Sequence, residues 1–472
     1  MNTEHDVAVV VPGYPMEIAQ HLVDTVFTFP GGVPSLIRHQ GSWWEYAGSR
    51  WSQRDDEWIM SRLHLELKDL YVEVVDANNR KKTVKFGPNT KSVGFVINAL
   101  KSLLVQKHTE LPVFLRGGEG FPNPHNLIAF RDQLVEVPGL RTWTKGPEWF
   151  DVTCVPCDYD PAAACPTWLR CVEQWGCGDP AWSTLLQRWF GYCLMNHRDY
   201  AKWLLLFGKS RAGKGTIVRI LSDLIGWDAF LSAQMTSFNG EHGLVGLENA
   251  RVLSITEAGK PDGRDADRLA ELMKRIVGGD PMHINPKYKD PVRNVVVKAA
   301  PMVQANEMPR LPDRGGGIST KMLMLPFNWS TRDPGSKEDV NLIGKLRAEL
   351  PGIAAWALQG ARHLVAADAA ERWPTPEGAP EVMEAYRAEN SPMDGFLAEY
   401  FVPNPSGFVL TEVIYERYAL WARQQDVRFP VPRQFFSRDL VENTSWPIAR
   451  SKPRGEEGRK RGFKGISLRS DR

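Results

Sequence analysis

The stretch GKSRAGKGT has the residue types and spacing of a loop that binds phosphate groups. Glycines let backbone N–H groups turn towards a phosphate, and the helix that follows adds partial positive charge at its N-terminus. Lys214 would reach the β- and γ-phosphates of a nucleotide, and the hydroxyl of Thr216 would approach Mg²⁺. The residues that we expect to hold the nucleotide are Gly208, Lys209, Ser210, Arg211, Ala212, Gly213, Lys214, Gly215 and Thr216.

The hydroxyl of this loop is displaced by one position, because Gly215 follows Lys214 where Ser or Thr is usual. The same form occurs in small nucleotide kinases, so the loop alone leaves a kinase and a motor ATPase open. A small nucleotide kinase would carry an arginine-rich lid soon after the loop, in a much shorter chain. This sequence lacks that layout, and the segments after the loop favour the motor ATPase.

A single carboxylate follows the next strongly apolar segment. The stretch ARVLSITE, residues 250–257, is an apolar strand pattern that ends in Glu257. ATP hydrolysis needs an acidic group for Mg²⁺ and for the attacking water. We therefore predict that Glu257 supplies this group and holds the metal together with Thr216. Thr256 stands where a second acid is common.

A second apolar segment, residues 295–306, ends in the amide of Asn306. An amide at the end of a strand beside the loop can polarise water and contact the γ-phosphate, so we predict that Asn306 senses the nucleotide. Between the two segments, residues 282–293 form a hairpin pattern whose polar tip carries Lys287, Tyr288 and Lys289. A solvated turn is one interpretation of this tip. The other is a contact with the backbone and bases of single-stranded DNA.

A parallel sheet is needed to bring these residues together. Residues 203–207 are apolar and precede the loop, and apolar residues recur after it at helical spacing. From residue 203 to about residue 330, strand patterns alternate with helical ones, which predicts a parallel sheet with crossover helices. The predicted fold class is α/β, with a mainly helical region before the sheet. At the end of the chain, two helices and a basic hairpin follow the order of a winged helix.

The chain is long enough for several domains. We expect a mixed N-terminal domain or collar at 1–150, a helical segment at 151–200, the ATPase core at 201–370, a linker at 371–390 and a winged-helix domain at 391–472. The linker follows from a run of prolines and glycines. Aromatic side chains in the first domain could stack on bases, but their spacing favours a packed core.

The composition is that of an ordinary globular protein. Of the 472 residues, 43% are hydrophobic and 24% are charged. No apolar run approaches the ~20 residues that span a bilayer. The N-terminus lacks the basic start and apolar centre of a signal peptide. We therefore expect a cytoplasmic protein that has no membrane partner.

The net charge of +2 hides an uneven distribution of charge. Residues 450–472 contain nine Lys or Arg residues and three acidic ones. Such a tail is either solvated surface or an electrostatic footprint for nucleic acid. The candidate DNA-binding residues in this tail are Arg459, Lys460, Arg461 and Lys464.

All six cysteines lie between Cys154 and Cys193, which raises the question of a zinc site. Cys154 and Cys157 form a CxxC pair, but no second pair follows, and the cluster contains no histidine before His197. Structural zinc sites combine four cysteines and histidines at characteristic spacings. Reduced structural thiols in a cytosolic protein are therefore our expectation.

The ordered set of motifs resembles the superfamily-three (AAA+) helicases of the phage and plasmid primase-helicase type, which are related to the poxvirus primase-helicase. The resemblance extends from about residue 40 to the end of the chain. It implies an AAA+-like P-loop ATPase core with a winged helix behind it. The motifs that carry it are GKSRAGKGT, ARVLSITE, LMKRIVGGDPMHINPKYKDP, MVQANEMP and MLMLPF, with LLQRWFGYCL before them and RGFKGISL after them.

This resemblance also implies partners and roles. ATP and Mg²⁺ are the implied cofactors, with Glu257 as the Walker-B acid and Asn306 as the first sensor. The hairpin tip at Lys287, Tyr288 and Lys289 would track single-stranded DNA, and the winged helix would bind duplex DNA. A homo-hexameric ring is implied, with a separate primase or loader as a further partner. The segment that leads into the hairpin is matched by Lys274, Gly278, Gly279 and Asp280.

The sequence departs from the family in two places. Where relatives carry an arginine shortly before the closing Pro-Phe, this chain has Ser319, Thr320 and Lys321. We expect Lys321 to act as a cationic finger on the nucleotide of a neighbouring subunit, without the bidentate fork of arginine. Arg314 is the alternative. Some relatives carry a primase domain at the N-terminus, and we expect this chain to be a helicase without one.

The expected function is that of an ATP-dependent replicative DNA helicase of a phage or mobile genetic element, acting in the cytoplasm of a bacterial host. It would form a ring, translocate on single-stranded DNA and unwind the duplex. Two other functions stay open. One is an origin-binding initiator or scaffold whose assembly ATP controls, and the other is a nucleic-acid-dependent ATPase of an anti-phage system.

Overall fold

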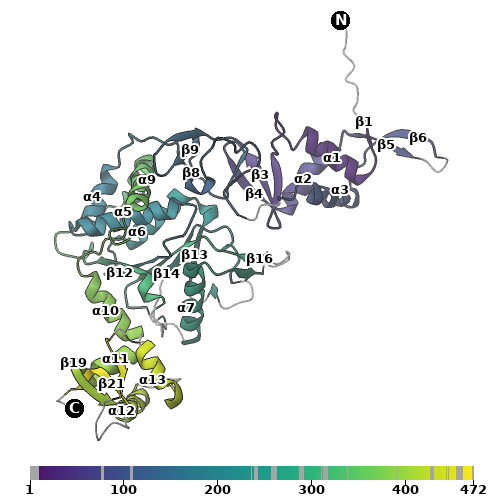
Figure 1. The fold of residues 1–472 in the computed structure, drawn as a ribbon. Helices are drawn as coiled ribbons and strands as arrows, with labels where there is room; N and C mark the ends of the chain where they lie inside the picture. The colour runs from purple at the N-terminus through teal and green to yellow at the C-terminus, as the bar shows by residue number, and fades with distance from the viewer. Residues whose placement is uncertain are drawn as a thin grey trace.

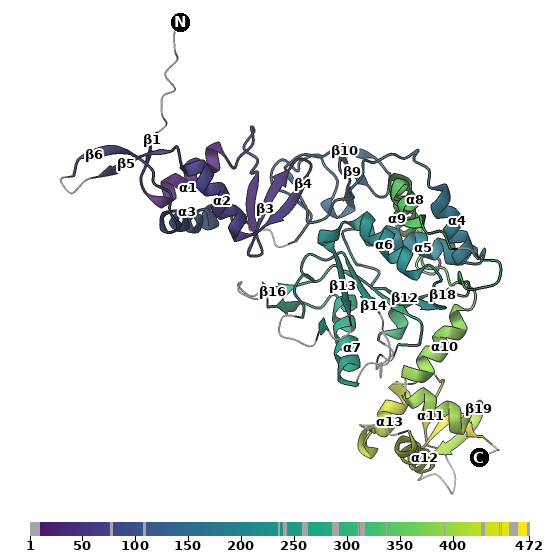
Figure 2. The ribbon, with the colours of Figure 1, turned by 180° about the vertical axis from the view of Figure 1, so that it is seen from behind.

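The computed structural model places a central sheet between an N-terminal lobe and a C-terminal lobe (Figure 1). The two lobes lie far apart, both in this view and from behind (Figure 2). None of the helices in the described part of the chain has the length and apolar content needed to cross a membrane. The structure describes residues 10–75, 79–106, 110–234, 237–238, 243–256, 263–285, 292–309, 311, 317–336, 338–390, 392–425, 430–442, 444, 446–452 and 461–469.

The central sheet has five parallel strands in the order β13-β14-β17-β12-β18. The prediction of an α/β fold with a parallel central sheet is therefore confirmed. Because all strands run the same way, their carboxyl ends meet at one end of the sheet and their amino ends at the other. The strands are β12 (Trp203–Gly208), β13 (Phe230–Gln234), β14 (Val252–Thr256), β17 (Ala300–Ala305) and β18 (Met322–Phe327).

Helices cover both faces of this sheet (Figure 1). Strand β12 is apolar at every position, which suits a strand that is buried on both sides. Leu204 and Leu206 belong to the core of one face, and Trp203 and Leu205 to the core of the other. The first face packs against α4 (Pro166–Trp175), α5 (Pro180–Leu194), α6 (Lys214–Ile225), α8 (Leu342–Ala348) and α9 (Leu350–Ala366).

The second face of the sheet packs against one long helix and a hairpin. The helix is α7 (Gly263–Gly278), which contributes Leu269 and Met273 to the core. The hairpin consists of β15 (Met282–Ile284) and β16 (Val292–Val295), which pair antiparallel.

The N-terminal lobe is mixed, as expected for residues 1–150, and the description of the region before the sheet as mainly helical does not fit it. Its strands are mostly two to six residues long and lie between glycines and prolines, so they are too short to show clear alternation in the sequence. Its elements are β1 (Val10–Pro12), α1 (Pro15–Thr25), β2 (Leu36–His39), β3 (Ser42–Ala47), β4 (Arg50–Arg54), α2 (Asp56–Leu67), β5 (Tyr71–Val75), β6 (Lys81–Lys85), α3 (Thr90–Leu103), β7 (Val113–Phe114), η1 (Pro124–Asn126), β8 (Leu127–Ala129), β9 (Gln133–Glu136), β10 (Thr142–Thr144) and β11 (Trp149–Phe150).

The C-terminal lobe is joined to the sheet by α10 (Ala379–Asn390) (Figure 1). This helix occupies the end of the segment expected to be a linker, and its Tyr386 is buried in the core of the second face. The lobe has its own core around Phe396 and Tyr418. Its elements are α11 (Pro392–Tyr400), β19 (Phe401–Leu410), α12 (Thr411–Gln424), α13 (Arg433–Glu442), β20 (Ala449–Ser451) and β21 (Gly462–Leu468).

Candidate active site at the carboxyl ends of the strands

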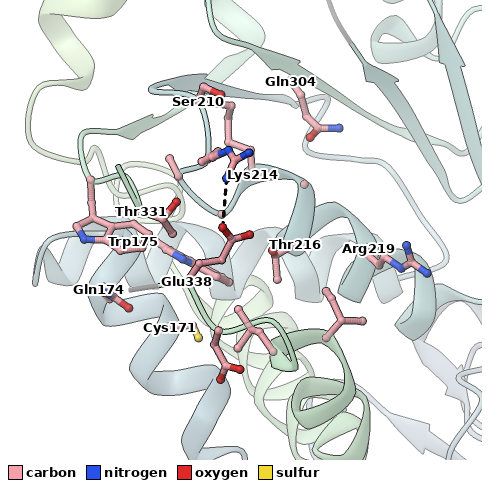
Figure 3. A pocket seen from close by; sticks show the side chains of 18 of the residues that line it. Cys171, Gln174, Trp175, Ser210, Lys214, Thr216, Arg219, Gln304, Thr331 and Glu338 are labelled. Atoms are coloured by element: carbon pink, nitrogen blue, oxygen red, sulfur yellow. Dashed lines mark hydrogen bonds and ion pairs between the residues drawn. The ribbon is translucent and has the colours of Figure 1, made fainter. Parts of the chain in front are cut away.

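The residues between β12 and α6 form a tight loop whose backbone geometry requires glycine at two points. Gly208 has a φ of +133°, and a side chain there would collide with the backbone of Phe327 on β18. Gly213 has a φ of +98° and lies directly against the ring of Trp175 on α4. Only glycine combines such backbone angles with so close an approach. The two glycines therefore set the path of the loop around the space that Figure 3 shows.

Lys214 lies at the centre of this loop and is almost fully buried. Its Nζ atom donates hydrogen bonds to the carbonyl oxygens of Gly208 at 2.8 Å and Lys209 at 2.6 Å. It also lies 5.7 Å from the centre of the Phe327 ring. Burial lowers the pKa of the Lys214 amine to about 8, because the surroundings solvate its charge poorly. A bound anion would compensate this charge, so the lysine is poised to receive one.

Helix α6 begins at the loop and directs its first turn at the same space. The first N–H groups of a helix have no partner within the helix, and the aligned dipoles add partial positive charge there. Lys214, Gly215 and Thr216 supply these groups and line the cavity described below. In the part of the chain that the structure describes, no atom beyond the two chain neighbours and the helix's own backbone lies within 4 Å of where a side chain on Gly215 would begin. Packing therefore does not explain why glycine replaces the usual hydroxyl residue.

The strand order brings two further predicted positions to this loop. Strand β17 lies between β12 and β14, so the residues that follow these three strands share one end of the sheet. Asn306 follows β17 directly and is exposed to the cavity. Thr256 ends β14 and also lines the cavity. Glu257, the predicted acid, lies outside the described residues.

The cavity at this end of the sheet has a volume of about 1140 Å³. We call it the carboxyl-end cavity. It joins Lys214 and Thr216 to Asn306 within one space, so the strand-end residues and the loop face each other. Several lining residues were not predicted from the sequence. They include Gln174, Trp175, Arg219, Gln304, Thr331 and Glu338, which are labelled in Figure 3.

The segment that follows β18 closes over the loop. The hydroxyl of Ser330 donates to the carbonyl of Ser210 at 2.8 Å, and the N–H of Thr331 donates to the carbonyl of Arg211 at 3.1 Å. Two ion pairs add to these bonds, Lys209 with Asp333 at 3.0 Å and Arg211 with Glu338 at 3.2 Å. The predicted nucleotide-contacting side chains of Lys209 and Arg211 are therefore paired with carboxylates of this segment, whereas the Lys214 amine is hydrogen-bonded to carbonyls of the loop.

The predicted cationic finger lies at the other end of the sheet. Lys321 precedes β18, whose first residue, Met322, pairs with the first residue of β12. Lys214 follows the last residue of β12. The two lysines of one chain are thus separated by the length of the sheet. Lys202 accompanies Lys321 there and donates to the carbonyl of Thr320 at 3.1 Å. Arg314, the alternative finger, lies outside the described residues.

The predicted DNA-binding residues are described only in part. Lys287, Tyr288 and Lys289 lie outside the described residues, although the two strands of their hairpin are present. Arg459 and Lys460 also lie outside. Lys464, on β21, and the preceding Arg461 are exposed on the C-terminal lobe, far from the hairpin strand β16 (Figure 2). The segment leading into the hairpin, with Lys274, Gly278, Gly279 and Asp280, is formed by α7 and its end.

All six cysteines are present as free thiols. Burial raises the pKa of Cys157 and Cys165 to about 11 and that of Cys193 to about 12, which favours the protonated form over the thiolate that binds metal. In the part of the chain that the structure describes, histidine, cysteine and carboxylate side chains form no group of three or more that could hold a metal ion.

Two comparisons with known proteins add to this geometry. A family model described as a family of unknown function (DUF5906) matches residues 206–319, from β12 to the turn before β18. Among solved structures, "The A form apo structure of NrS-1 C terminal region-CTR" is similar, with a TM-score of 0.48, 10% sequence identity, and coverage of 96% of this chain and 100% of that chain. "The apo structure of NrS-1 C terminal region (305-718)" has a TM-score of 0.47, 10% identity and coverage of 96% and 99%.

Proposed function

We propose that this chain is an ATP-dependent DNA helicase of the superfamily-three type, which works as a ring on single-stranded DNA. One observation carries the proposal. The glycine-bounded loop with Lys214, the last residue of β14, Thr256, and the residue after β17, Asn306, line a single cavity of about 1140 Å³. A loop, an acid and an amide at adjacent strand ends are the parts that hydrolysis of a nucleoside triphosphate requires.

The residues predicted from the sequence each have a role in this proposal. Backbone N–H groups of the loop and the Lys214 amine bind the β- and γ-phosphates of ATP. Thr216 and Glu257 hold Mg²⁺, which would neutralise charge on the phosphate oxygens. Asn306 orients the attacking water towards the γ-phosphate. The pairing of Lys209 and Arg211 with the segment after β18 supports this division of roles, because it leaves Lys214 as the lysine that receives the phosphates.

The position of Lys321 supports a ring. A lysine at the amino end of β18 cannot contact the nucleotide of its own chain, because Lys214 lies at the opposite end of the sheet. Between neighbouring subunits, Lys321 of one chain would face the nucleotide of the next. A homo-hexamer would complete each site in this way. Such a ring would use a separate primase or loader, within the cytoplasm of a bacterial host of a phage or mobile element.

Contacts with DNA are assigned to two parts of the chain. The hairpin of β15 and β16, with Lys287, Tyr288 and Lys289 at its tip, would hold single-stranded DNA. The C-terminal lobe would act as a winged helix and bind duplex DNA through its basic hairpin. The order of its helices α12 and α13 before the paired strands β20 and β21 supports this assignment, as does the exposure of Arg461 and Lys464. Arg459 and Lys460 would join them.

An initiator with weak unwinding is a second candidate. It is favoured by Lys321, which lacks the planar fork with which arginine binds phosphate oxygens. In such a protein ATP would control assembly at an origin, and hydrolysis would be slow. This candidate uses the same cavity but does not displace a DNA strand.

Strand displacement with purified protein separates these functions. The wild type should unwind a partial duplex in the presence of ATP and Mg²⁺, and Lys214→Ala should abolish unwinding. Lys91→Ala, which removes an exposed lysine of α3 far from the cavity, serves as the control and should unwind normally. Unwinding that survives Lys214→Ala would refute the motor. A wild type that binds ATP and DNA without displacing a strand would favour the initiator.

A further inference from the structure

A second cavity, of about 960 Å³, lies at the amino ends of the same strands. We call it the amino-end cavity. The residues that immediately precede the central strands contribute three cations to it, namely Arg198 before β12, Arg251 before β14 and Lys298 before β17. The N-terminal lobe forms another wall with His125, and the base of the hairpin adds residues 294–297.

The cations of this cavity outnumber their buried counter-charges. Arg251 forms an ion pair with Asp151 at 2.7 Å, and both side chains are almost fully buried. Arg198 donates to the carbonyl oxygens of Tyr192, Met195, His197 and Arg251 at 2.7 to 3.0 Å. Lys298 donates to the carbonyl of Leu111 at 2.8 Å. Among the described residues, neither Arg198 nor Lys298 forms an ion pair with a carboxylate.

Burial and the neighbouring positive charges lower the pKa values of these groups. Burial, followed by the charge of Arg251, lowers the pKa of Lys298 to about 8. Burial lowers the pKa of Arg198 to about 10. Burial, followed by the charge of Lys298, lowers the pKa of His125. Burying charge without a counter-charge is unfavourable. An anion in the cavity would relieve this cost for the whole group.

Carboxylates at the rim of the cavity provide that counter-charge only in part, since the charge of Glu110 raises the pKa of Lys298 and of His125 against the larger effect of burial. Asp199 is 77% exposed and pairs with His197 at 3.0 Å. Glu248 accepts a hydrogen bond from the backbone N–H of Gly246 at 2.8 Å. Glu110 is exposed. Amide side chains line the cavity as well, and they can donate hydrogen bonds to phosphate and sugar oxygens. They are Gln40, Asn123, Asn126, Asn249 and Asn294.

We propose that the amino-end cavity binds a phosphate group, and that Lys298 and His125 are its principal contacts. The phosphate can belong to a nucleic-acid backbone or be free. The position of the cavity favours the backbone, because Asn294 and the neighbouring residues at the base of the β15–β16 hairpin form part of its wall. That assignment rests on the proposed function, whereas phosphate binding itself does not.

Chemical labelling of the wild type tests the site directly. A lysine with a lowered pKa reacts readily with acetic anhydride, so mass spectrometry can follow acetylation of Lys298. Inorganic phosphate and an oligothymidylate are added separately, and chloride at equal ionic strength is the control. We expect both phosphate-containing probes to slow acetylation of Lys298 and chloride to leave it unchanged. Protection by inorganic phosphate alone would identify free phosphate as the ligand. Protection by neither probe would overturn the proposal.

A salt titration of DNA binding provides the second measurement. Lys298→Gln should weaken binding of the oligothymidylate roughly fivefold and reduce the slope of log K against log salt by about 0.7, the effect of losing one phosphate contact on a single strand. Lys91→Gln removes the same charge from an exposed site on α3. Because this site lies away from the cavity, the variant should change the slope much less than Lys298→Gln does. Equal slopes for the two variants, together with no protection in the labelling experiment, would overturn the site.

The two proposals fail in different ways. Lys214→Ala should abolish ATP hydrolysis and leave phosphate protection of Lys298 intact, since the two cavities lie at opposite ends of the sheet. If the wild type hydrolyses no ATP but phosphate still protects Lys298, the proposed motor function is refuted and the phosphate site is supported. If the wild type hydrolyses ATP and unwinds DNA but neither probe protects Lys298 from acetylation, the motor function is supported and the phosphate site is refuted.

Discussion

The two ends of the central sheet are built differently, although the same strands form both. At the carboxyl ends, the charge of one buried lysine, Lys214, is held by loop carbonyls, and the rest of the cavity offers hydroxyls, amides, helix N–H groups and charged side chains of both signs, such as Arg219 and Glu338. At the amino ends, Arg198, Arg251 and Lys298 lie together, and Asp151 is the buried carboxylate that pairs with one of them.

This difference separates two tasks. The carboxyl-end cavity combines a rigid loop with an exposed amide, which suits chemistry at a phosphate that must be positioned accurately. The amino-end cavity has more buried cations than buried carboxylates, which suits holding a phosphate without reacting with it. In the proposed helicase, the first cavity would consume ATP and the second would contact the strand that moves. The predictions below test each end against the other.

The largest expected effect concerns the ion pair at the amino end. Asp151→Asn removes the counter-charge of the buried Arg251 and should lower the free energy of unfolding by about 3–5 kcal/mol. The control is Asp158→Asn, which breaks the exposed pair with Arg131 and should have a much smaller effect. Urea unfolding followed by circular dichroism measures both. Equal effects of the two changes would show that Asp151 does not compensate a buried charge.

At the carboxyl end, the amide of Gln304 within β17 and the amide of Asn306 directly after it should contribute differently to the rate of ATP hydrolysis. Asn306→Ala should reduce the rate of ATP hydrolysis about 100-fold and leave ATP binding largely intact, because a donor that acts on the transition state is lost. Gln304→Ala should reduce the rate of ATP hydrolysis less, since Gln304 lies within the strand and is half-buried. Steady-state hydrolysis and nucleotide titrations measure the two variants. A larger loss in Gln304→Ala would identify Gln304 as the sensor.

Lys321, at the amino end of β18, should act on the nucleotide bound at the carboxyl ends of the strands in the neighbouring subunit. Lys321→Ala should reduce hydrolysis about tenfold, less than the loss of an arginine finger, because lysine lacks the bidentate fork. Lys321→Arg should be at least as active as the wild type. An equimolar mixture of Lys321→Ala and Lys214→Ala should be more active than either variant alone, because mixed rings contain interfaces with both lysines intact. No gain on mixing would argue against a shared site.

A further expected effect is a dependence of stability on pH at the amino end. The pKa of Lys298 is about 8 in the folded chain and about 10.4 in the unfolded chain, so the unfolded chain binds more protons between these values. Stability should therefore increase with pH across this range. Relative to Lys298→Met, the wild type should gain thermal stability as pH rises above about 8. A constant difference between the two proteins would show that Lys298 keeps its ordinary pKa.

The sequence predicted the carboxyl end better than the amino end, and the reason is local. The loop from Gly208 to Thr216 is one continuous stretch between an apolar strand and a helix, and strand β17 ends at the predicted amide, Asn306. A strand pattern followed by a polar residue marks such a position directly. The catalytic roles of these residues stay predictions, and Glu257 lies outside the described residues.

The amino end could not be predicted in this way. Arg198, Arg251 and Lys298 are far apart in the sequence and occur before strands, where polar residues are common and carry no pattern. Only the strand order β14-β17-β12 brings them together. The segment after β18 was missed for a similar reason, because its contacts with the loop depend on the parallel pairing of β18 with β12. Pairing of distant strands is a tertiary property that local spacing does not encode.

The central claim is that ATP hydrolysis at the carboxyl end is coupled to DNA. The rate of ATP hydrolysis with and without single-stranded DNA tests it most directly. We expect single-stranded DNA to stimulate hydrolysis by the wild type severalfold and Lys214→Ala to show no hydrolysis in either condition. A wild-type rate that is unchanged by DNA, or hydrolysis that survives Lys214→Ala, would refute the proposed coupling.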